Sequence, residues 1–260
     1  MKSRTVVHLA AAAGLLALGA CSESTAPASL VDQTTLTTDV ASSSGDAVAL
    51  DVQVLSTNEG FAGLVAPIQA SAAAVSGDSI SYTRTRNCYD STGAGTTCGT
   101  SAVRTAVLHV TFTGFRADTA ENGAIFTGNI SRTVLDTLFR IYTGTTETSR
   151  QHDGLSTGSD TVSFVGPSVQ RLYEEAGSDS VEAVTYNLPR IDNPWPISGK
   201  IVRNVSVHAT FTSATRSSTT DVTKRVEVDF PPDNQGNVVL KIDNKTCNLN
   251  LVTHHVSNCQ

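Results

Sequence analysis

The sequence has 260 residues and a net charge of −6 with its histidines neutral, and 16% of its residues are charged. An acidic surface argues against nucleic acid as a partner and against direct docking on anionic lipid headgroups. The chain is long enough to bury a core in one large domain or two small ones, and its abundant Ser, Thr and Gly favour a β protein with many turns.

The N-terminal segment has three parts. Lys2 and Arg4 precede an apolar run over residues 5–18, which is too short to span a bilayer. Leu18-Gly19-Ala20-Cys21 follows directly, so the segment resembles the signal peptide and lipobox of bacterial lipoproteins. The resemblance implies that residues 1–20 are removed and that Cys21 carries a diacylglyceryl group and an acyl chain such as palmitate. An ordinary cleaved signal with a Cys beside the cut is the alternative.

Two further expectations follow from this resemblance. Ser22, rather than Asp, follows the lipidated Cys, which implies an anchor in the cell outer membrane. Removal of residues 1–20 takes away Lys2 and Arg4 and no acid, so the mature charge would be −8. Residues 21–45 are rich in Ser, Thr and Ala, and we predict a flexible tether between the lipid and a β-rich domain over residues 46–260.

Hydrophobic alternation dominates the chain after residue 79. Residues 46–55 are compatible with a strand or a short helix, and residues 60–75 are only weakly patterned. A helix is predicted over residues 167–176, since Pro167 and Gly177 punctuate an apolar helical face. The fold class is therefore mainly β, an antiparallel sandwich or strongly curved sheet with one or two short helices. The predicted strands cover residues 80–82, 103–115, 124–130, 134–142, 161–165, 181–186, 197–212, 222–230, 238–242 and 247–252.

One pattern occurs twice. Val103-Arg104 is followed by His109-x-Thr-Phe-Thr, and Val202-Arg203 is followed by His208-x-Thr-Phe-Thr at the same spacing. Each copy predicts a strand with one buried apolar face and one Thr-rich face. Duplication into two related halves and chance similarity between amphipathic strands both explain the pattern.

The cysteines indicate disulfides. With Cys21 lipidated, four remain, and an even number in an oxidising compartment favours two disulfides. Three connectivities are open. Local pairing is the economical one, and it joins Cys88 to Cys98 and Cys247 to Cys259. Paired C-x-x-C spacing, typical of zinc sites, is missing from the sequence.

Gly154-Leu155-Ser156-Thr157-Gly158 matches the nucleophile elbow of α/β-hydrolases. An elbow needs an apolar strand before the Ser and a helix after it, whereas polar residues precede this motif and a predicted strand follows. We therefore interpret the motif as a turn and keep Ser156 as a weak catalytic candidate.

The remaining candidates are cationic or aromatic. His109 and His208 could bind a metal if the two repeats pair, with His152 as a third ligand, but solvated histidines on a Thr-rich face are the favoured interpretation. Arg104 and Arg203 fall on apolar strand faces, where an Arg must find a carboxylate, reach the rim or meet a ligand. Trp195 is expected to anchor packing between two prolines. Arg84, Arg86, Arg104 and Arg203 together form a candidate ligand or salt-bridge cluster.

The leading functional prediction is a lipid-anchored envelope protein with a non-catalytic binding or structural role. Its partners would be the membrane, through the lipid, and a protein or small molecule in the envelope, and no cofactor is predicted. A serine hydrolase that uses Ser156 is one alternative. A small-ligand carrier on a half-barrel is the other, and it requires a large apolar cavity.

Overall fold

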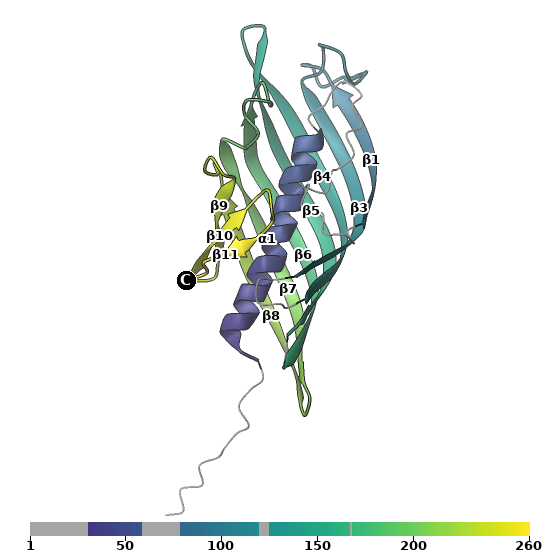
Figure 1. Cartoon of the computed structure of the whole chain (residues 1–260). Coiled ribbons are helices and arrows are strands. Elements are labelled where there is room, and N and C mark those ends of the chain that lie inside the picture. The colour runs from purple at the N-terminus through teal and green to yellow at the C-terminus, as the bar shows by residue number, and fades with distance from the viewer. Residues whose placement is uncertain (1–30, 59–78, 120–124, 167) are drawn as a thin grey trace, which may run out of the picture.

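The computed structural model describes residues 31–58, 79–119, 125–166 and 168–260. Eleven strands form one open antiparallel sheet, and a single helix of the described chain, α1 (Gln33–Asn58), lies across it (Figure 1). The predicted mainly β class with a strongly curved antiparallel sheet is confirmed. The predicted signal peptide over residues 1–20, Cys21 with residues 22–30 of the predicted tether, and residues 60–75 lie outside the described residues.

The sheet is almost a simple meander. From β3 to β11, each strand pairs with the next along the chain, and only β1 and β2 depart from this order, because β1 lies between β2 and β3. The edge strands are therefore β2 and β11. The strands are β1 (Ser79–Tyr89), β2 (Gly95–Thr96), β3 (Thr105–Thr119), β4 (Ile125–Thr143), β5 (Thr146–Val165), β6 (Val169–Asn187), β7 (Ser198–Ser213), β8 (Ser217–Asp229), β9 (Asn237–Ile242), β10 (Lys245–Asn250) and β11 (Val256–Ser257).

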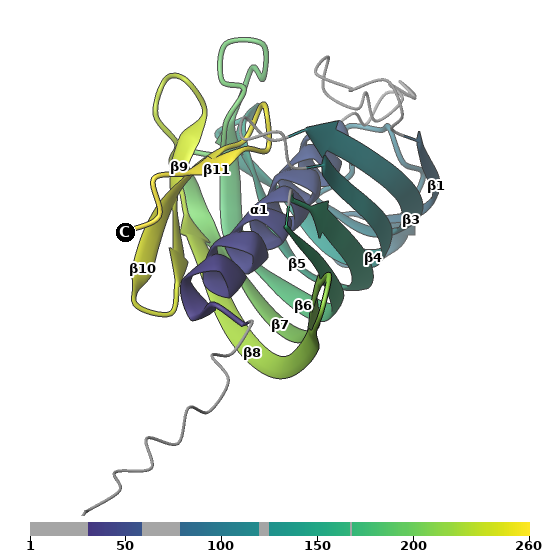
Figure 2. The ribbon, with the colours of Figure 1, turned by 60° about the horizontal axis from the view of Figure 1, so that its bottom comes forward.

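The sheet curls around α1 (Figure 2). Asp32 caps the helix, because its carboxylate accepts hydrogen bonds from the backbone N–H groups of Thr34 and Thr35 at 3.2 and 3.0 Å. These bonds and that of the Thr35 hydroxyl lower the pKa of Asp32. Most helix residues from Leu36 to Leu55 are buried, on several sides of the helix at once.

The helix corrects one sequence-based prediction and decides between the two alternatives of another. The tether was expected to reach residue 45, but the helix begins at Gln33, and Leu36, Val40 and Ala41 belong to the main core. Residues 46–55, which were compatible with a strand or a helix, continue α1. Small side chains allow the helix to lie close to the concave sheet, and this tertiary burial stabilises a segment with weak helical signals.

The concave face of the sheet carries the core. The predicted inward residues of the two similar strands, Ala106 to Phe112 in β3 and Ile201 to Phe211 in β7, are buried at alternate positions. Phe164, Tyr173 and Phe211 contact edge to face, with ring centroids 5.6 and 6.1 Å apart. Trp195 packs against the same core, as predicted.

Residues 167–176 do not form the predicted helix. Strand β6 runs from Val169 to Asn187 and turns Tyr173, Glu175 and Asp179 inward. The sequence pattern was misleading because this strand buries polar groups as well as apolar ones. The two strands predicted over residues 124–142 are one, β4, and β5 begins at Thr146 rather than at residue 161.

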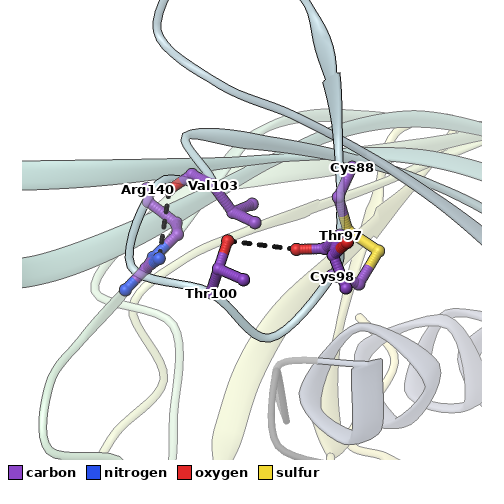
Figure 3. Close-up of a disulfide and its surroundings, with 6 residues drawn as sticks. All are labelled: Cys88, Thr97, Cys98, Thr100, Val103 and Arg140. Atoms are coloured by element: carbon purple, nitrogen blue, oxygen red, sulfur yellow. Dashed lines mark hydrogen bonds between the residues drawn. A yellow bond between two sulfur atoms is a disulfide. The ribbon is translucent and has the colours of Figure 1, made fainter.

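The predicted local pairing of the cysteines is confirmed. The sulfur atoms of Cys88 and Cys98 are 1.95 Å apart, and those of Cys247 and Cys259 are 2.06 Å apart. The first disulfide closes the connection after β1 (Figure 3). In that connection the Thr100 hydroxyl donates a hydrogen bond to the carbonyl of Thr97 at 3.1 Å, as Figure 3 shows.

Replacing Cys247 and Cys259 together by Ser is expected to lower the free energy of unfolding by about 2–3 kcal/mol, since a short loop loses its cross-link. Urea unfolding followed by circular dichroism measures the change. When both proteins also carry Cys88→Ser and Cys98→Ser, so that only the second disulfide differs, the reduced parent should match the variant. Equal stability of the oxidised and reduced forms would contradict the prediction.

Candidate functional site

A square of buried charges lies at the centre of the concave face, beneath α1. Arg132 of β4 donates to Asp179 at 2.7 Å and to Asp160 at 2.8 Å. Arg203 of β7 donates to the same two carboxylates at 3.1 Å each. All four side chains are almost inaccessible, at 1–5% exposure. Each Asp therefore bridges both arginines, and we call these four residues the buried square.

The strand register makes room for the buried square. Arg132 lies beside Gly158 of β5, which in turn lies beside Gly177 of β6. A Cβ atom on Gly158 would lie 2.7 Å from Cγ of Arg132, and one on Gly177 would lie 2.8 Å from Cζ of Arg203. The two glycines thus leave the space in which the long arginine side chains lie flat on the sheet.

Two further carboxyl groups adjoin the buried square. Burial raises the pKa of Asp51 of α1 well above its ordinary value, and the charge of Asp179 raises it further, against the opposing arginines. Burial likewise raises the pKa of Glu175 to about 7, although Arg203 and a hydrogen bond from Ser43 oppose the shift. Charge is balanced when the two bridging aspartates are ionised and Asp51 and Glu175 are protonated.

Helix α1 is fixed to the sheet by these polar contacts. The Ser43 hydroxyl donates to Glu175 at 2.6 Å, and Asp39 accepts hydrogen bonds from Arg171 at 2.6 Å and from the Tyr173 hydroxyl at 2.5 Å. All of these partners belong to β6. The buried polar groups therefore set the position of the helix along the sheet, in a core where apolar contacts alone are non-directional.

Ser156 lies inside strand β5, neither in a turn nor on a nucleophile elbow. Its side chain is fully buried on the concave face, between Val134 of β4 and Asp179 of β6 in the register. Nearby on this face, Nδ1 of His152 lies 2.7 Å from Asp136, and both side chains are fully buried. Gly154 lies against Asp136, and Gly158 leaves room for Arg132, so packing explains the two glycines of the motif.

A group of arginines, separate from the buried square, lies at the end of the sheet near the last residues of α1. Five arginines make up this cluster, which we call the arginine end: Arg84, Arg86, Arg104, Arg140 and Arg150. Burial lowers the pKa of Arg86, and the charges of Arg84 and Arg150 lower it further. Arg150 pairs in register with Tyr186, whose hydroxyl contacts Ser56 near the end of the helix.

Glu147 and Tyr142 hold part of the arginine end in place. Glu147 bonds to Arg140 and accepts a hydrogen bond from Arg150 at 2.7 Å. Burial alone would raise the pKa of Glu147, but these two bonds outweigh it and lower that pKa. The Tyr142 ring lies 4.3 Å from the guanidinium of Arg104 and 5.3 Å from that of Arg140, both within cation–π range.

The predicted cluster of four arginines is thus divided. Arg84, Arg86 and Arg104 lie at the arginine end, whereas Arg203 belongs to the buried square. Sequence reasoning missed Arg140 and Arg150, although both flank one hairpin and pair directly across it. A bulge between Ile141 and Tyr142 shifts the register, so counting back from the hairpin alone would have placed Ser149, not Arg150, opposite Arg140. The similar Arg104 and Arg203 have different environments, because Arg104 precedes β3 and Arg203 lies well inside β7.

The histidines are not brought together. His109 and His208 are exposed on the outer face of β3 and β7, with three strands between them, whereas His152 is buried on the concave face. His208 bonds to Asp221 at 2.7 Å, which raises its pKa. His254 lies 2.7 Å from Asp46 of α1 and so joins the C-terminal loop to the helix.

Neither a metal-binding group nor a spanning helix is found in the part of the chain that the structure describes. No three His, Cys, Asp or Glu side chains there are placed to share a metal ion. No helix in that part is both long enough and apolar enough to cross a bilayer. Comparison with protein-family models, curated proteins and solved structures finds no match.

Proposed function

We propose that the chain is a lipid-anchored protein of the bacterial cell envelope with a non-catalytic binding role, attached through Cys21 to the outer membrane. The lipobox-like Leu18-Gly19-Ala20-Cys21 supports the anchor. The binding role is supported by one observation. The polar groups of the core are enclosed beneath α1, whereas the arginine end includes the exposed Arg84 and lies at the far end of the helix.

The length of α1 would hold the arginine end away from the membrane. Gln33 stands twelve positions after Cys21, so the lipid would lie within about 40 Å of the start of α1 even with the chain fully extended. The helix itself is 26 residues long, which corresponds to about 39 Å. In Figure 1 the helix begins at the bottom of the molecule, and the β4–β5 hairpin rises at the top. The anchor and the arginine end would therefore be at opposite ends.

The two alternatives gain no support from this arrangement. Ser156 is fully buried and cannot meet a substrate without a displacement of α1. A small-ligand carrier would need an apolar cavity inside the curved sheet, and α1 occupies that position (Figure 2).

Lipidation is tested by metabolic labelling with a fatty-acid analogue in a bacterial host that processes lipoproteins. Cys21→Ser is expected to abolish the label and to release the protein from the membrane fraction, because the thiol that would accept the lipid is lost. Ser24→Ala, a neighbouring substitution, should keep both the label and the membrane association. Label that persists in Cys21→Ser would refute the anchor.

A further inference from the structure

Strand β8 has a neighbouring strand on both sides over only part of its length. Strand β7 pairs with residues 217–229, whereas β9 pairs only with residues 226–228. After Ile242 the chain turns back into β10, and Asp243 in that turn bonds to Lys224. In the part of the chain that the structure describes, no strand pairs with residues 217–225 on the side away from β7. We call these residues the open edge.

The hairpin between β7 and β8 determines which backbone groups face the open edge. Ser213 donates its N–H to the carbonyl of Arg216 at 2.8 Å, and Phe230 donates to that of Gly199 at 3.0 Å. Hydrogen-bonded pairs alternate along an antiparallel ladder, so the even-numbered residues of β8 bond to β7. The N–H and C=O groups of residues 219, 221 and 223 therefore point away from β7, and the side chains of these three residues are exposed. These backbone groups can bind an added strand.

The outer face beside the open edge is acidic. Glu174 of β6, His208 of β7 and Asp221 of β8 follow one another in the register across three strands, and this row keeps a negative charge whether His208 is neutral or protonated. Nδ1 of His208 lies 2.7 Å from Oδ1 of Asp221, which orients the carboxylate, while the Asp221 side chain stays 83% exposed. A hollow of about 520 Å³ lies over this row, and Ser206 and Thr223 also line it. No Lys or Arg belongs to its described lining, so a basic side chain would have to come from a partner.

We propose that the open edge binds an extended peptide segment of a partner protein as an added strand, with a Lys or Arg side chain beside Asp221. Main-chain hydrogen bonds to residues 219, 221 and 223 provide affinity, and the charge of Asp221 selects the basic residue. A second copy of the chain fits less well. Antiparallel pairing of residues 219–223 of two copies would set their Asp221 carboxylates opposite each other, and each chain carries a net charge of −6. The inference depends neither on the lipid anchor nor on the arginine end.

Fluorescence anisotropy on the full chain, purified in detergent, tests the proposal with labelled peptides. The probe is a short peptide of alternating Thr and Val with Arg at its centre, and its twin has Glu in place of that Arg. The Arg peptide is expected to bind at least about tenfold more tightly than the Glu peptide, and a higher salt concentration should reduce the difference. Equal binding of the two peptides, or binding of neither, would overturn the proposal.

Two variants locate the site. Thr223→Pro removes an N–H that faces the open edge and leaves the bonds to β7 in place, so it should abolish peptide binding. Asp221→Asn should weaken binding of the Arg peptide at least about tenfold, because the carboxylate that selects the basic residue is lost. Asp229→Asn is the matched control and should bind normally, since the carboxylate at the other end of β8 is bonded to Lys241. Circular dichroism establishes that each variant is folded, and Asp221→Asn keeps the test valid if Thr223→Pro is not.

The variants can also refute the site. Full binding by folded Thr223→Pro would exclude β8 as the docking strand. Equal losses in Asp221→Asn and Asp229→Asn would mean non-specific attraction of charge. A dimer that sedimentation equilibrium detects and that Thr223→Pro dissociates would make a second copy, not a peptide, the occupant of the open edge. Peptide binding that fails while Cys21 still takes up the lipid label would leave the lipoprotein proposal intact.

Discussion

Arg203→Met is expected to lower the free energy of unfolding by about 3–5 kcal/mol, the largest effect of any single substitution considered for this protein. Met retains most of the side-chain volume and removes the charge, so Asp160 and Asp179 lose one of their two bridging arginines. Both carboxylates stay buried, and a buried charge without enough compensation is costly. The loss would be a large fraction of a typical domain's stability.

Equilibrium unfolding in urea measures this effect. Arg225→Met makes the same substitution on the neighbouring strand, where the side chain is 56% exposed, and should change stability by less than about 0.5 kcal/mol. If Arg203→Met is too unstable to study at pH 7, measurement near pH 5 should recover part of the loss, because the deprived carboxyl groups can take up a proton. A change no greater than that of the control would show that the buried square contributes little.

The protein is expected to lose stability as the pH rises from about 4.5 to about 7. Below pH 4.5, Glu175 is protonated in both the folded and unfolded chains, so it has no effect on the difference between them. Between its ordinary pKa of 4.5 and its folded pKa of about 7, the unfolded chain releases the proton while the folded chain keeps it. The folded state then binds more protons, and its stability falls with pH, by about 3 kcal/mol in all. The raised pKa of Asp51 acts in the same direction.

Glu175→Gln isolates this effect. The amide is always neutral, and its oxygen can still accept the hydrogen bond from Ser43. Thermal unfolding should therefore be similar in the variant and the natural protein at pH 4.5, whereas the variant should be more stable at pH 8. Other titrating groups, among them His208 and Asp39, are common to both proteins and cancel in the comparison. Parallel pH profiles for the two proteins would contradict the prediction.

The fold could be predicted where the buried face is apolar. Strands β3, β7, β8 and β9 alternate cleanly, and the sequence indicated each of them to within a few residues. Strand β5 was recognised only over its last five residues, because its inward face before them carries His152, Gly154, Ser156, Gly158 and Asp160. Asp160 belongs to the buried square and Gly158 makes room for it, and the small or polar side chains of all five hide the alternation on which strand recognition depends.

For a related reason, helix α1 was not predicted over residues 33–45 and was only one of two alternatives over residues 46–55. A helix on the surface of a domain shows one apolar stripe, whereas α1 is enclosed by a curved sheet and is buried on most sides. Its Val, Thr and Ser residues also have modest helix propensity, so tertiary packing determines its conformation. The buried square itself joins β4, β5, β6 and β7, and a single sequence does not indicate which of its arginines and aspartates meet. The cysteine pairs were predictable because their partners are close in the chain.

The central position of α1 also has a consequence for the order in which the molecule can assemble. The strands pair mostly with their neighbours in the chain, so hairpins can form as soon as two of them have been synthesised. The contacts of the helix are distant instead: Asp39 meets Arg171, and Ser43 meets Glu175, each 132 residues further on. Helix α1 leaves the ribosome before every strand and is therefore among the last elements to find its place. Until the sheet has been synthesised, the helix segment has no partner to bury it. Large apolar side chains exposed during that delay would promote aggregation, whereas the small and hydroxylated side chains of α1 reduce this risk.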